Sequence, residues 1–521
     1  MKKDKTAASA ADKLNYKRTF LIGFGFMGCM VLWSVYNSYV PVILRGKLTE
    51  IWSGDSAFIQ FITTHPWMSW LSVALLVNAV MTIDNVFGVI FQPFFGKKSD
   101  HTHTKMGKRM PYILVFLPLC ALAFSFIPVA ATVKAAGLSI LLMMSVIICF
   151  NFMMSIWRSP VVSLMPDFTP SHLQSDANAV INIMGGIGQM VGFVVGIIAS
   201  AIVGILGFTT MSQALKASTN DFGQIVDDAG NLVLDAAGNA QYVNYTPVFV
   251  VTAAISLLCL LVLTIFYKRN KKYDLSAEVG FEKGNEEEKK KEKIKIKNLP
   301  ITKDEKRSLL IMLAALFLIN NATEAIVPNF TNFANGTLHV APIYSTLMMA
   351  VFAVSLAAFG IPAGIMGRKL GRKKTIIIGL IAIVAMFAVY LTVSQILPSE
   401  EGKVNTFTWV TLWVALVVGG AAVGCININT LPLVLAIGGR EYVGTFTGYY
   451  YTATMSASVT GPILCGLVIG LFKEDYNFMF LFCAIMFTLG LAVITQVRHG
   501  ELSKDEDDTW LKEAVEEAEK D

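Results

Sequence analysis

Three charged residues lie inside long apolar segments of this 521-residue sequence: Asp84, Arg158 and Glu324. A charged side chain is costly in hydrocarbon, so a carboxylate at such a position indicates a function. A carboxyl group in apolar surroundings is more stable protonated than ionised, and it can exchange a proton when its access to water alternates. We therefore expect Asp84 and Glu324 to couple transport to a proton. The alternative is that a carboxylate pairs with Arg158 and only holds helices together.

Amide and aromatic side chains accompany these charges at helical spacing. Amides match the donors and acceptors of sugar hydroxyls, and an aromatic face stacks on the apolar face of a pyranose. For any single residue, a hydrogen bond between helices is the alternative. A polar central cavity explains the whole set better, because its members are spread over several apolar segments. The candidate substrate-binding residues are Trp33, Tyr36, Asn37, Asn85, Asn151, Asn182, Asn320, Asn321 and Asn427.

The segments that must position these residues are long and apolar. The chain is 54% hydrophobic and 15% charged, whereas about 25% of a soluble chain is charged. A run of about 20 apolar residues spans a bilayer. We predict an all-α membrane protein of twelve transmembrane helices in two six-helix bundles. The expected spans are 20–44, 70–96, 111–133, 138–165, 177–206, 247–267, 308–333, 342–367, 375–396, 409–437, 443–471 and 477–497.

Basic residues predict the orientation of these spans. If the N-terminus is inside, 36 of the 42 lysines and arginines fall on the inner side and 6 on the outer side. Such an excess marks the cytoplasmic face. We expect a multi-pass protein of the cell membrane with both termini in the cytoplasm, in contact with the lipid bilayer. The net charge of +5 then reflects the inner loops and does not indicate nucleic-acid binding.

The polar segments divide the chain into five parts. We expect a cytoplasmic tail at 1–19, a first bundle at 20–267, a charged cytoplasmic linker at 268–307, a second bundle at 308–497 and a cytoplasmic tail at 498–521. An outer insert at 207–246 carries two Ala-Gly-Asn turns that flank residues 232–234, which suggests a small hairpin. This insert either caps the outer mouth of the protein or is an ordered spacer.

Similar basic loops follow the second span of each half. The first carries Gly96, Asp100, Gly107, Lys108 and Arg109, and the second includes Arg368 and Arg372. The repetition predicts two related bundles, an arrangement typical of transporters. We assign these residues to gating or structure, together with Arg158, and not to substrate binding.

Signatures of enzymes are missing from the sequence. It has no GxSxG, HExxH or Walker loop and no cluster of cysteine and histidine. Its seven cysteines fall inside predicted spans, and none of its six histidines does. We expect no enzymatic activity, no metal, no cofactor other than the coupling proton, and a monomer.

Several motifs resemble those of one transporter family. Gln92-Pro93, Gly96-x-x-Ser99-Asp100 and Gly107-Lys108-Arg109-x-Pro111 resemble the loop signature of sucrose–proton symporters and their bacterial relatives. These belong to the glycoside–pentoside–hexuronide:cation symporter group of the major facilitator superfamily. Further similar stretches are Trp157-Arg158-Ser-Pro160, Leu164-Met-Pro166-Asp167, Ser175-Asp-Ala177-Asn178 and Gly444-Thr-Phe-Thr-Gly448-Tyr-Tyr-Tyr.

This resemblance implies alternating access, with an α-glucoside such as sucrose or maltose moving with a proton. In that picture Asp100 and Arg109 belong to the cytoplasmic gate and are not substrate ligands. We assign Asp167 to gating or structure as well. The sequence departs from the plant sucrose symporters at Asn151, where they carry an aspartate, so coupling must use Asp84 or Glu324. The paired aspartates of the sodium-type branch align with Gly88 and Gln92, which argues against a sodium site of that design.

Our hypothesis is a secondary transporter that imports a di- or oligosaccharide with a proton, and that binds it near the midplane between the two halves. One alternative keeps the fold and changes the cargo to a hexuronide or another small anion, or makes the protein an uncoupled sugar facilitator. Another, from a different class, is a membrane sensor that binds sugar without moving it. Sequence alone does not name the sugar.

Overall fold

The structure is a computed structural model. It describes residues 15–54, 60, 64–65, 68, 71–102, 104–169, 174–227, 231–235, 238–274, 302–396, 405–438 and 443–499. Most of the predicted linker, most of the N-terminal tail and nearly all of the C-terminal tail lie outside these residues.

Apolar helices make up nearly all of the described chain. Eleven of them are long and apolar enough to cross a membrane, and the 17-residue helix α16 supplies a twelfth apolar segment. This confirms the predicted twelve-span all-α fold. The spans are α2 (Tyr16–Trp52), α4 (Val73–Met81) with α5 (Ile83–Asp100), α6 (Met110–Ala131), α7 (Ala136–Phe168), α8 (Gln174–Ile205), α10 (Thr246–Asn270), α11 (Lys303–Leu338), α12 (Pro342–Leu370), α13 (Arg372–Ile396), α14 (Thr406–Gly438), α15 (Val443–Leu471) and α16 (Phe478–Ile494).

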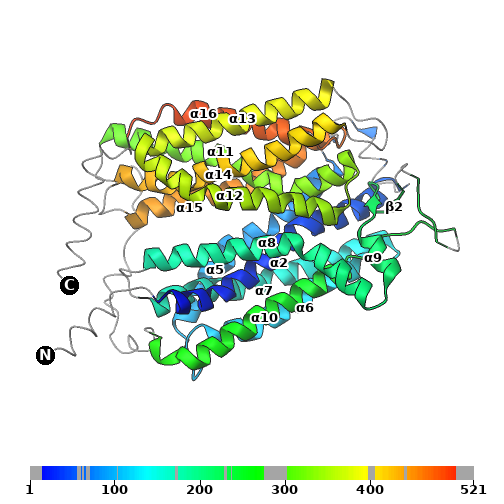
Figure 1. Ribbon diagram of the computed structural model, residues 1–521, viewed down its shortest axis with the longest axis horizontal. Coiled ribbons are helices and arrows are strands. Elements are labelled where there is room, and N and C mark those ends of the chain that lie inside the picture. Colours follow the sequence, from blue (N-terminus) through cyan, green and yellow to red (C-terminus); the bar gives the residue numbers. More distant parts are fainter. Residues whose placement is uncertain are drawn as a thin grey trace. The chain divides into compact units, whose positions relative to one another are not determined.

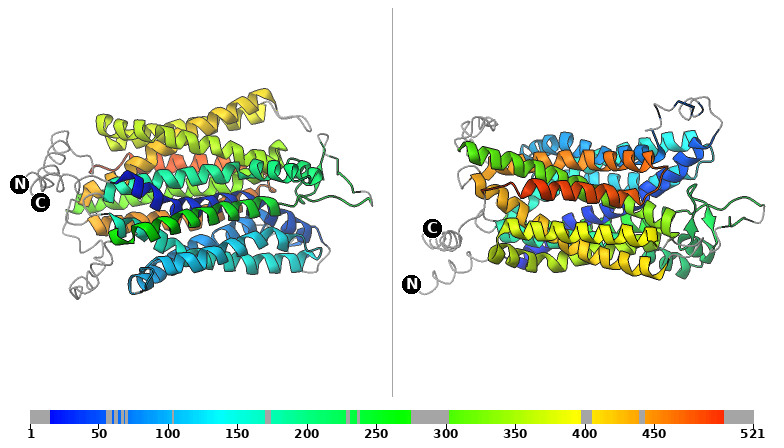
Figure 2. Two further views of the ribbon diagram at one scale, coloured as in Figure 1. Left: turned by 60° about the horizontal axis from the view of Figure 1, so that its bottom comes forward. Right: turned by 90° about the horizontal axis from the view of Figure 1, so that it is seen from above.

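The chain forms two compact units. Unit 1 contains residues 1–282 and 330–350, and unit 2 contains residues 283–329 and 351–521. Helices α11 and α12 therefore each run from one unit into the other. In unit 1, α2 packs against α8, α7 and α10, and α7 also packs against α5 and α6 (Figure 1). In unit 2, α13 packs against α14 and α16, while α15 contacts both α14 and α16 (Figure 2).

Small residues allow close contact between α2 and α8. A Cβ atom added at Gly188 of α8 would lie 2.5 Å from the carbonyl oxygen of Met27, and one at Gly192 would lie 2.5 Å from Cβ of Ser34. Neither site has room for a side chain. Such approach of two backbones is a common way to pack helices in a bilayer, where the lipid is as apolar as the side chains.

The second span is interrupted at Thr82. Helix α4 ends at Met81 and α5 begins at Ile83, so Asp84 lies in the first turn of a new helix segment. The first turn of a helix carries unpaired N–H groups and a partial positive charge, which favour a nearby carboxylate. The interruption therefore places Asp84 at the end of α5 that suits its charged form.

The outer insert folds onto one end of unit 1 (Figure 1). After α9 (Thr209–Leu215), β1 (Ser218–Thr219) pairs antiparallel with β2 (Ile225–Val226). Further bridges join Val226 to Leu232 and residue 234 to residue 240. In each connecting turn an aspartate accepts the backbone N–H of the asparagine four residues later, at 2.8 Å. Residues 232–234 are therefore bridged on one side to the end of β2 and on the other to residue 240, in a small antiparallel structure such as the turn residues suggested.

Candidate functional site

An aromatic cluster connects α2 and α7 in unit 1. The rings of Tyr36 and Phe150 stack with centroids 5.1 Å apart, and Trp33 lies 5.6 Å from Tyr36. Asn151 Nδ2 donates a hydrogen bond of 3.1 Å to the Tyr36 hydroxyl. Both of these residues are buried, whereas Trp33 and Asn37 are only half-buried. In this conformation Tyr36 and Asn151 bind each other, and Trp33 and Asn37 keep accessible surface for a ligand.

Arg158 lies beside this cluster. Its guanidinium carbon is 5.6 Å from the centroid of the Trp33 ring, a distance at which a cation is attracted to the ring face. Arg158 follows Asn151 by seven residues on α7, so the two share one face of the helix. Its half-buried side chain adds a positive charge next to the accessible indole.

Asp84 and Asn85 occupy the start of α5. Both side chains are half-buried, and Asp84 Oδ1 accepts a 2.6 Å hydrogen bond from the backbone N–H of Asn85. Asp84 lies within electrostatic range of the Tyr36 hydroxyl. The structure thus brings a carboxylate close to the aromatic and amide residues that the sequence singled out on α2 and α7.

A phenylalanine seam fixes α5 against α7. Phe87, Phe91 and Phe95 follow each other at four-residue spacing, and each meets Phe152 at a ring distance between 5.2 and 6.5 Å. Edge-to-face pairs of this kind add to the free energy gained from burial. Because the seam and Asp84 belong to the same helix, it also fixes the position of the carboxylate.

The candidate residues of unit 2 differ in their accessibility. Asn321 is buried, and its Oδ1 accepts a 2.9 Å hydrogen bond from Thr460 of α15. Asn320 is half-buried and Glu324 is exposed on α11, four residues apart and therefore on one helix face. On α14, Asn427 is exposed. Asn321 thus connects helices, while Asn320, Glu324 and Asn427 keep accessible surface.

Asn182 of α8, in unit 1, is also exposed. On α14 the buried amide is Asn429, whose Nδ2 donates to the carbonyl oxygens of Ala363 and Cys425 at 3.2 and 2.9 Å. Residue spacing alone did not separate such connecting amides from accessible ones.

Arg109 organises the loop between the second and third spans. Its Nε donates to Asp167 Oδ2 at 2.9 Å, and its two terminal nitrogens contact Asp100 and Ser99 at 2.5 Å each. Burial lowers the pKa of the Arg109 guanidinium, but the hydrogen bond and charge of Asp167 and the charge of Asp100 raise it by more, so its pKa lies above its ordinary value. Arg109 is therefore a permanent cation that joins the end of α5 to the end of α7. We call these residues, Arg109, Asp167, Asp100 and Ser99, the Arg109 cluster.

Two glycines of this loop are required by geometry. Gly107 has φ +82°, and a Cβ there would collide with the hydroxyl of Tyr267. That hydroxyl donates to Asp274 at 2.8 Å, at the end of the 3₁₀ turn η3 (Lys271–Tyr273). A Cβ at Gly96 would lie 2.6 Å from Ser159 Oγ. Lys108, also predicted for this loop, is half-buried beside Arg109.

The corresponding loop of unit 2 is held differently. Arg372 donates to the carbonyl oxygen of Pro432 at 3.2 Å, and Lys373 donates to the carbonyl oxygens of Thr495 and Val497 at 2.9 and 2.7 Å. Gly371 again has a positive φ, of +98°. Arg368 is exposed. The described contacts of Arg372 and Lys373 thus include several carbonyl oxygens, whereas those of Arg109 include two carboxylates.

A second buried arginine, Arg45, was not singled out by the sequence. It lies near the end of α2 in unit 1 and forms a 2.7 Å ion pair with Asp221 of the insert. Its NH1 also donates to the carbonyl oxygen of Asn332 at 3.5 Å. Two further hydrogen bonds join the insert to the adjoining end of α11: Thr219 Oγ1 to Asn335 at 3.0 Å, and Ser218 Oγ to the carbonyl oxygen of His339 at 2.6 Å. These residues are the Arg45 cluster.

The family model described as "MFS/sugar transport protein" matches residues 21–437. The chain therefore belongs to this family of the major facilitator superfamily, as its motifs indicated, and it is a multi-pass membrane transporter. Among curated proteins, none matches this chain.

Solved transporters share the fold. The nucleoside transporter NupG has a TM-score of 0.56 at 13% identity, with 93% of this chain and 99% of that chain covered. A bacterial homologue of the lysosomal transporter Spinster has 0.56 at 11% identity, covering 93% and 97%. The peptide transporter POT, solved with sulfate, has 0.55 at 11% identity, covering 92% and 95%. At these identities the likeness establishes the major facilitator fold and says nothing of substrate.

Proposed function

We propose that the protein imports a di- or oligosaccharide of the sucrose or maltose type together with a proton, by alternating access. The observation that carries the proposal is the position of Asp84. A half-buried carboxylate at a helix interruption lies within electrostatic range of Tyr36. Tyr36 contacts Trp33 and Asn151, and this aromatic ring and amide offer the groups that recognise sugars. The sugar-transport description of the family supports the cargo class.

Within this proposal the carboxylates bind the proton. Asp84 in unit 1 and Glu324 in unit 2 are the two acidic residues in the interior of the predicted spans, where a carboxyl group points to a function. Protonation removes the charge and lowers the cost of reorienting the loaded carrier through the membrane. In unit 1 the sugar contacts would come from Trp33 and Asn37 on α2.

The first experiment is uptake of labelled sucrose and maltose into proteoliposomes under a pH gradient and then under a sodium gradient. Accumulation driven only by the pH gradient is the expected result. In the next step Asp84→Asn and Glu324→Gln are compared with Asp304→Asn, a matched change at an exposed carboxylate. At least one of the first two variants should lose uphill uptake and keep counterflow exchange. If both still concentrate sugar, the coupling assignment is wrong.

A specific observation supports a second candidate cargo. The guanidinium carbon of Arg158 lies 5.6 Å from the centroid of the half-buried Trp33 ring, and a guanidinium at this place would also suit a hexuronide or another small anion. Inhibition of uptake by glucuronate, but not by neutral glucosides, would favour this cargo. Equal flux with and without gradients would instead indicate an uncoupled facilitator, and saturable binding without flux would indicate a sensor.

We also propose that the protein acts as a monomer in the cell membrane. Both termini would lie in the cytoplasm, because the short loops at 97–109 and 368–374 are basic. Membrane-impermeant labelling of a cysteine introduced at Lys216 and of one at Lys98 tests this orientation. Only the first should react from outside.

A further inference from the structure

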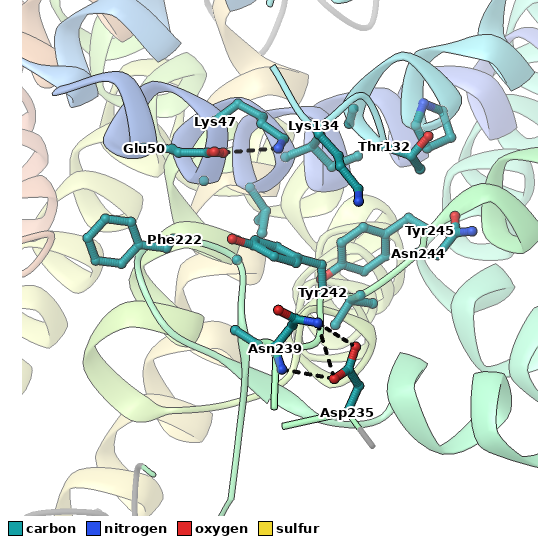
Figure 3. A pocket seen from close by; sticks show the side chains of 18 residues that line it. Lys47, Glu50, Thr132, Lys134, Phe222, Asp235, Asn239, Tyr242, Asn244 and Tyr245 are labelled. Carbon is teal, nitrogen blue, oxygen red and sulfur yellow. Dashed lines mark hydrogen bonds and ion pairs between the residues drawn. The ribbon is translucent and has the colours of Figure 1, made fainter. Parts of the chain in front are cut away.

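Unit 1 contains a cavity of about 580 Å³ outside the aromatic cluster (Figure 3). It lies between the end of α2, the end of α6 and the insert, and its polar lining includes Lys47, Glu50, Lys134, Asp235, Asn239 and Tyr242. Given the rise per residue of an α-helix, Lys47 lies roughly 16 Å from Tyr36 along the axis of α2. The cavity is therefore separate from the residues to which we assigned transport. Its size falls in the range of small-molecule sites, about 300–1,000 Å³.

The polar side chains of this cavity are already held in place by their neighbours. Lys47 Nζ lies 3.0 Å from Glu50 Oε2 and 5.5 Å from the centroid of the Tyr242 ring. Gln224 Nε2 donates to the Tyr242 hydroxyl at 3.2 Å. Asn239 donates from its backbone and its side chain to Asp235, and Figure 3 shows these two residues facing each other. Such preorganisation lowers the entropy that a ligand must overcome on binding.

The charges of the lining indicate which ligand it suits. Two ammonium groups, Lys47 and Lys134, are matched by two carboxylates, Glu50 and Asp235, so the cavity has no net charge with which to select an ion. It offers strong donors and strong acceptors together, and these pair with the hydroxyl groups of a neutral saccharide, each of which both donates and accepts. The ring of Tyr242, which is half exposed, adds a face on which a sugar ring can pack.

The insert wall of the cavity is joined to the α2 wall. A Cβ at Gly46 would lie 3.1 Å from the carbonyl oxygen of Phe222, and the ion pair of Arg45 with Asp221 lies next to this contact. Glycine at position 46 lets the insert backbone approach α2 closely. In this conformation the contact joins the two walls into one site.

We infer that this cavity is an external binding site for a neutral glycoside, which holds the sugar near the outer end of unit 1 before it is transported. The choice of ligand rests on the proposed function, whereas the existence of the site rests on the cavity itself. The insert is then a ligand-binding element, and hydrogen bonds between Asn239 and Asp235 hold these two residues in the wall.

Protection from chemical modification tests the site without requiring transport. Tyr242→Cys in the full-length protein is treated with a membrane-impermeant maleimide, with and without saturating sucrose or maltose. We expect the sugar to slow labelling at least fivefold. Lys216→Cys is the matched control, because Lys216 is exposed at the end of α9 and does not line the cavity. Its labelling should not change.

Uptake kinetics give the second readout. Lys134→Ala combined with Tyr242→Ala should raise the KM for sugar about five- to tenfold and leave the maximal rate unchanged, while Tyr242→Phe with wild-type Lys134 should keep the wild-type KM. Lys216→Ala is the control. Normal uptake with neither protection nor a change in KM overturns the inference. Protection in a protein that transports none of the sugars supports the site and overturns the proposed function.

Discussion

Two buried arginines of unit 1, Arg109 and Arg45, show how differently one residue type can be used. Arg109 contacts Asp167, Asp100 and Ser99 in the loop after the second span. The described contacts of Arg45 include Asp221 of the insert and a carbonyl oxygen on α11. The side chain of Asp167 is 13% exposed, whereas that of Asp221 is 56% exposed. The two guanidinium groups are chemically the same, but their acidic partners differ in how much of the side chain is exposed to solvent.

This difference in exposure predicts that the two ion pairs contribute differently to stability. Removing one partner of a buried ion pair leaves an uncompensated charge, whereas an exposed carboxylate can exchange its partner for water at little cost. We therefore expect the Arg109 cluster to act as a permanent joint between α5 and α7. The Arg45 cluster should be a weaker contact between the insert and the helix ends, one that can break and re-form during a transport cycle.

The largest effect is expected for Arg109→Ala. It leaves Asp167 with little water and without its cation, and losses of about 3–5 kcal/mol are typical when one partner of a buried pair is removed. The thermal midpoint of the purified protein should fall steeply and uptake should be lost. Arg109→Lys should rescue only part of the stability, because one ammonium group cannot reach Asp167, Asp100 and Ser99 in the geometry of the guanidinium.

Loss of uptake with an unchanged thermal midpoint would mean that Arg109 acts in gating alone. That outcome would contradict the prediction that Arg109 forms a permanent structural contact whereas Arg45 forms a contact that can break.

A comparison of Asp167→Asn with Asp100→Asn gives the next largest effect. Both carboxylates contact Arg109, but Asp100 is 55% exposed. An exposed ion pair contributes about 0–1 kcal/mol, and a hydrogen bond between charged groups with restricted access to water contributes about 1.5–3 kcal/mol. Asp167→Asn should therefore destabilise the protein more than Asp100→Asn in parallel thermal unfolding. Equal losses would show that exposure does not decide the strength of these pairs.

The same two clusters show what the sequence could predict. The spans were predictable because bilayer thickness sets the length of an apolar run, and α2 to α16 follow that rule. Gly107 and Arg109 were predictable because one short loop carries them in a pattern shared with known transporters. Asp167, 58 positions from Arg109, was identified through that resemblance and not from spacing.

The Arg45 cluster could not be predicted from the sequence. Arg45 and Asp221 are 176 positions apart, and neither belongs to a motif or to a predicted span with other charges. Only the packing of the insert against α2 brings them together. The prediction for Tyr36 and Asn151 was limited in a related way. Spacing placed each residue on a polar helix face, but only the fold shows that they form a hydrogen bond with each other.

The smallest effect on stability is expected for Asp221→Asn. The substituted side chain is still able to accept a hydrogen bond from Arg45, and the exposed charge that is lost contributes about 1 kcal/mol or less. Its consequence should be kinetic: if the Arg45 cluster opens during each cycle, weakening it should raise the labelling rate of an added cysteine at Ser218, whose hydroxyl contacts His339. Labelling of the same cysteine with and without Asp221→Asn measures this, and Asp227→Asn, in a turn of the same insert, is the control. A loss of stability as large as that of Asp167→Asn would instead show that the outer contact is as permanent as the inner one.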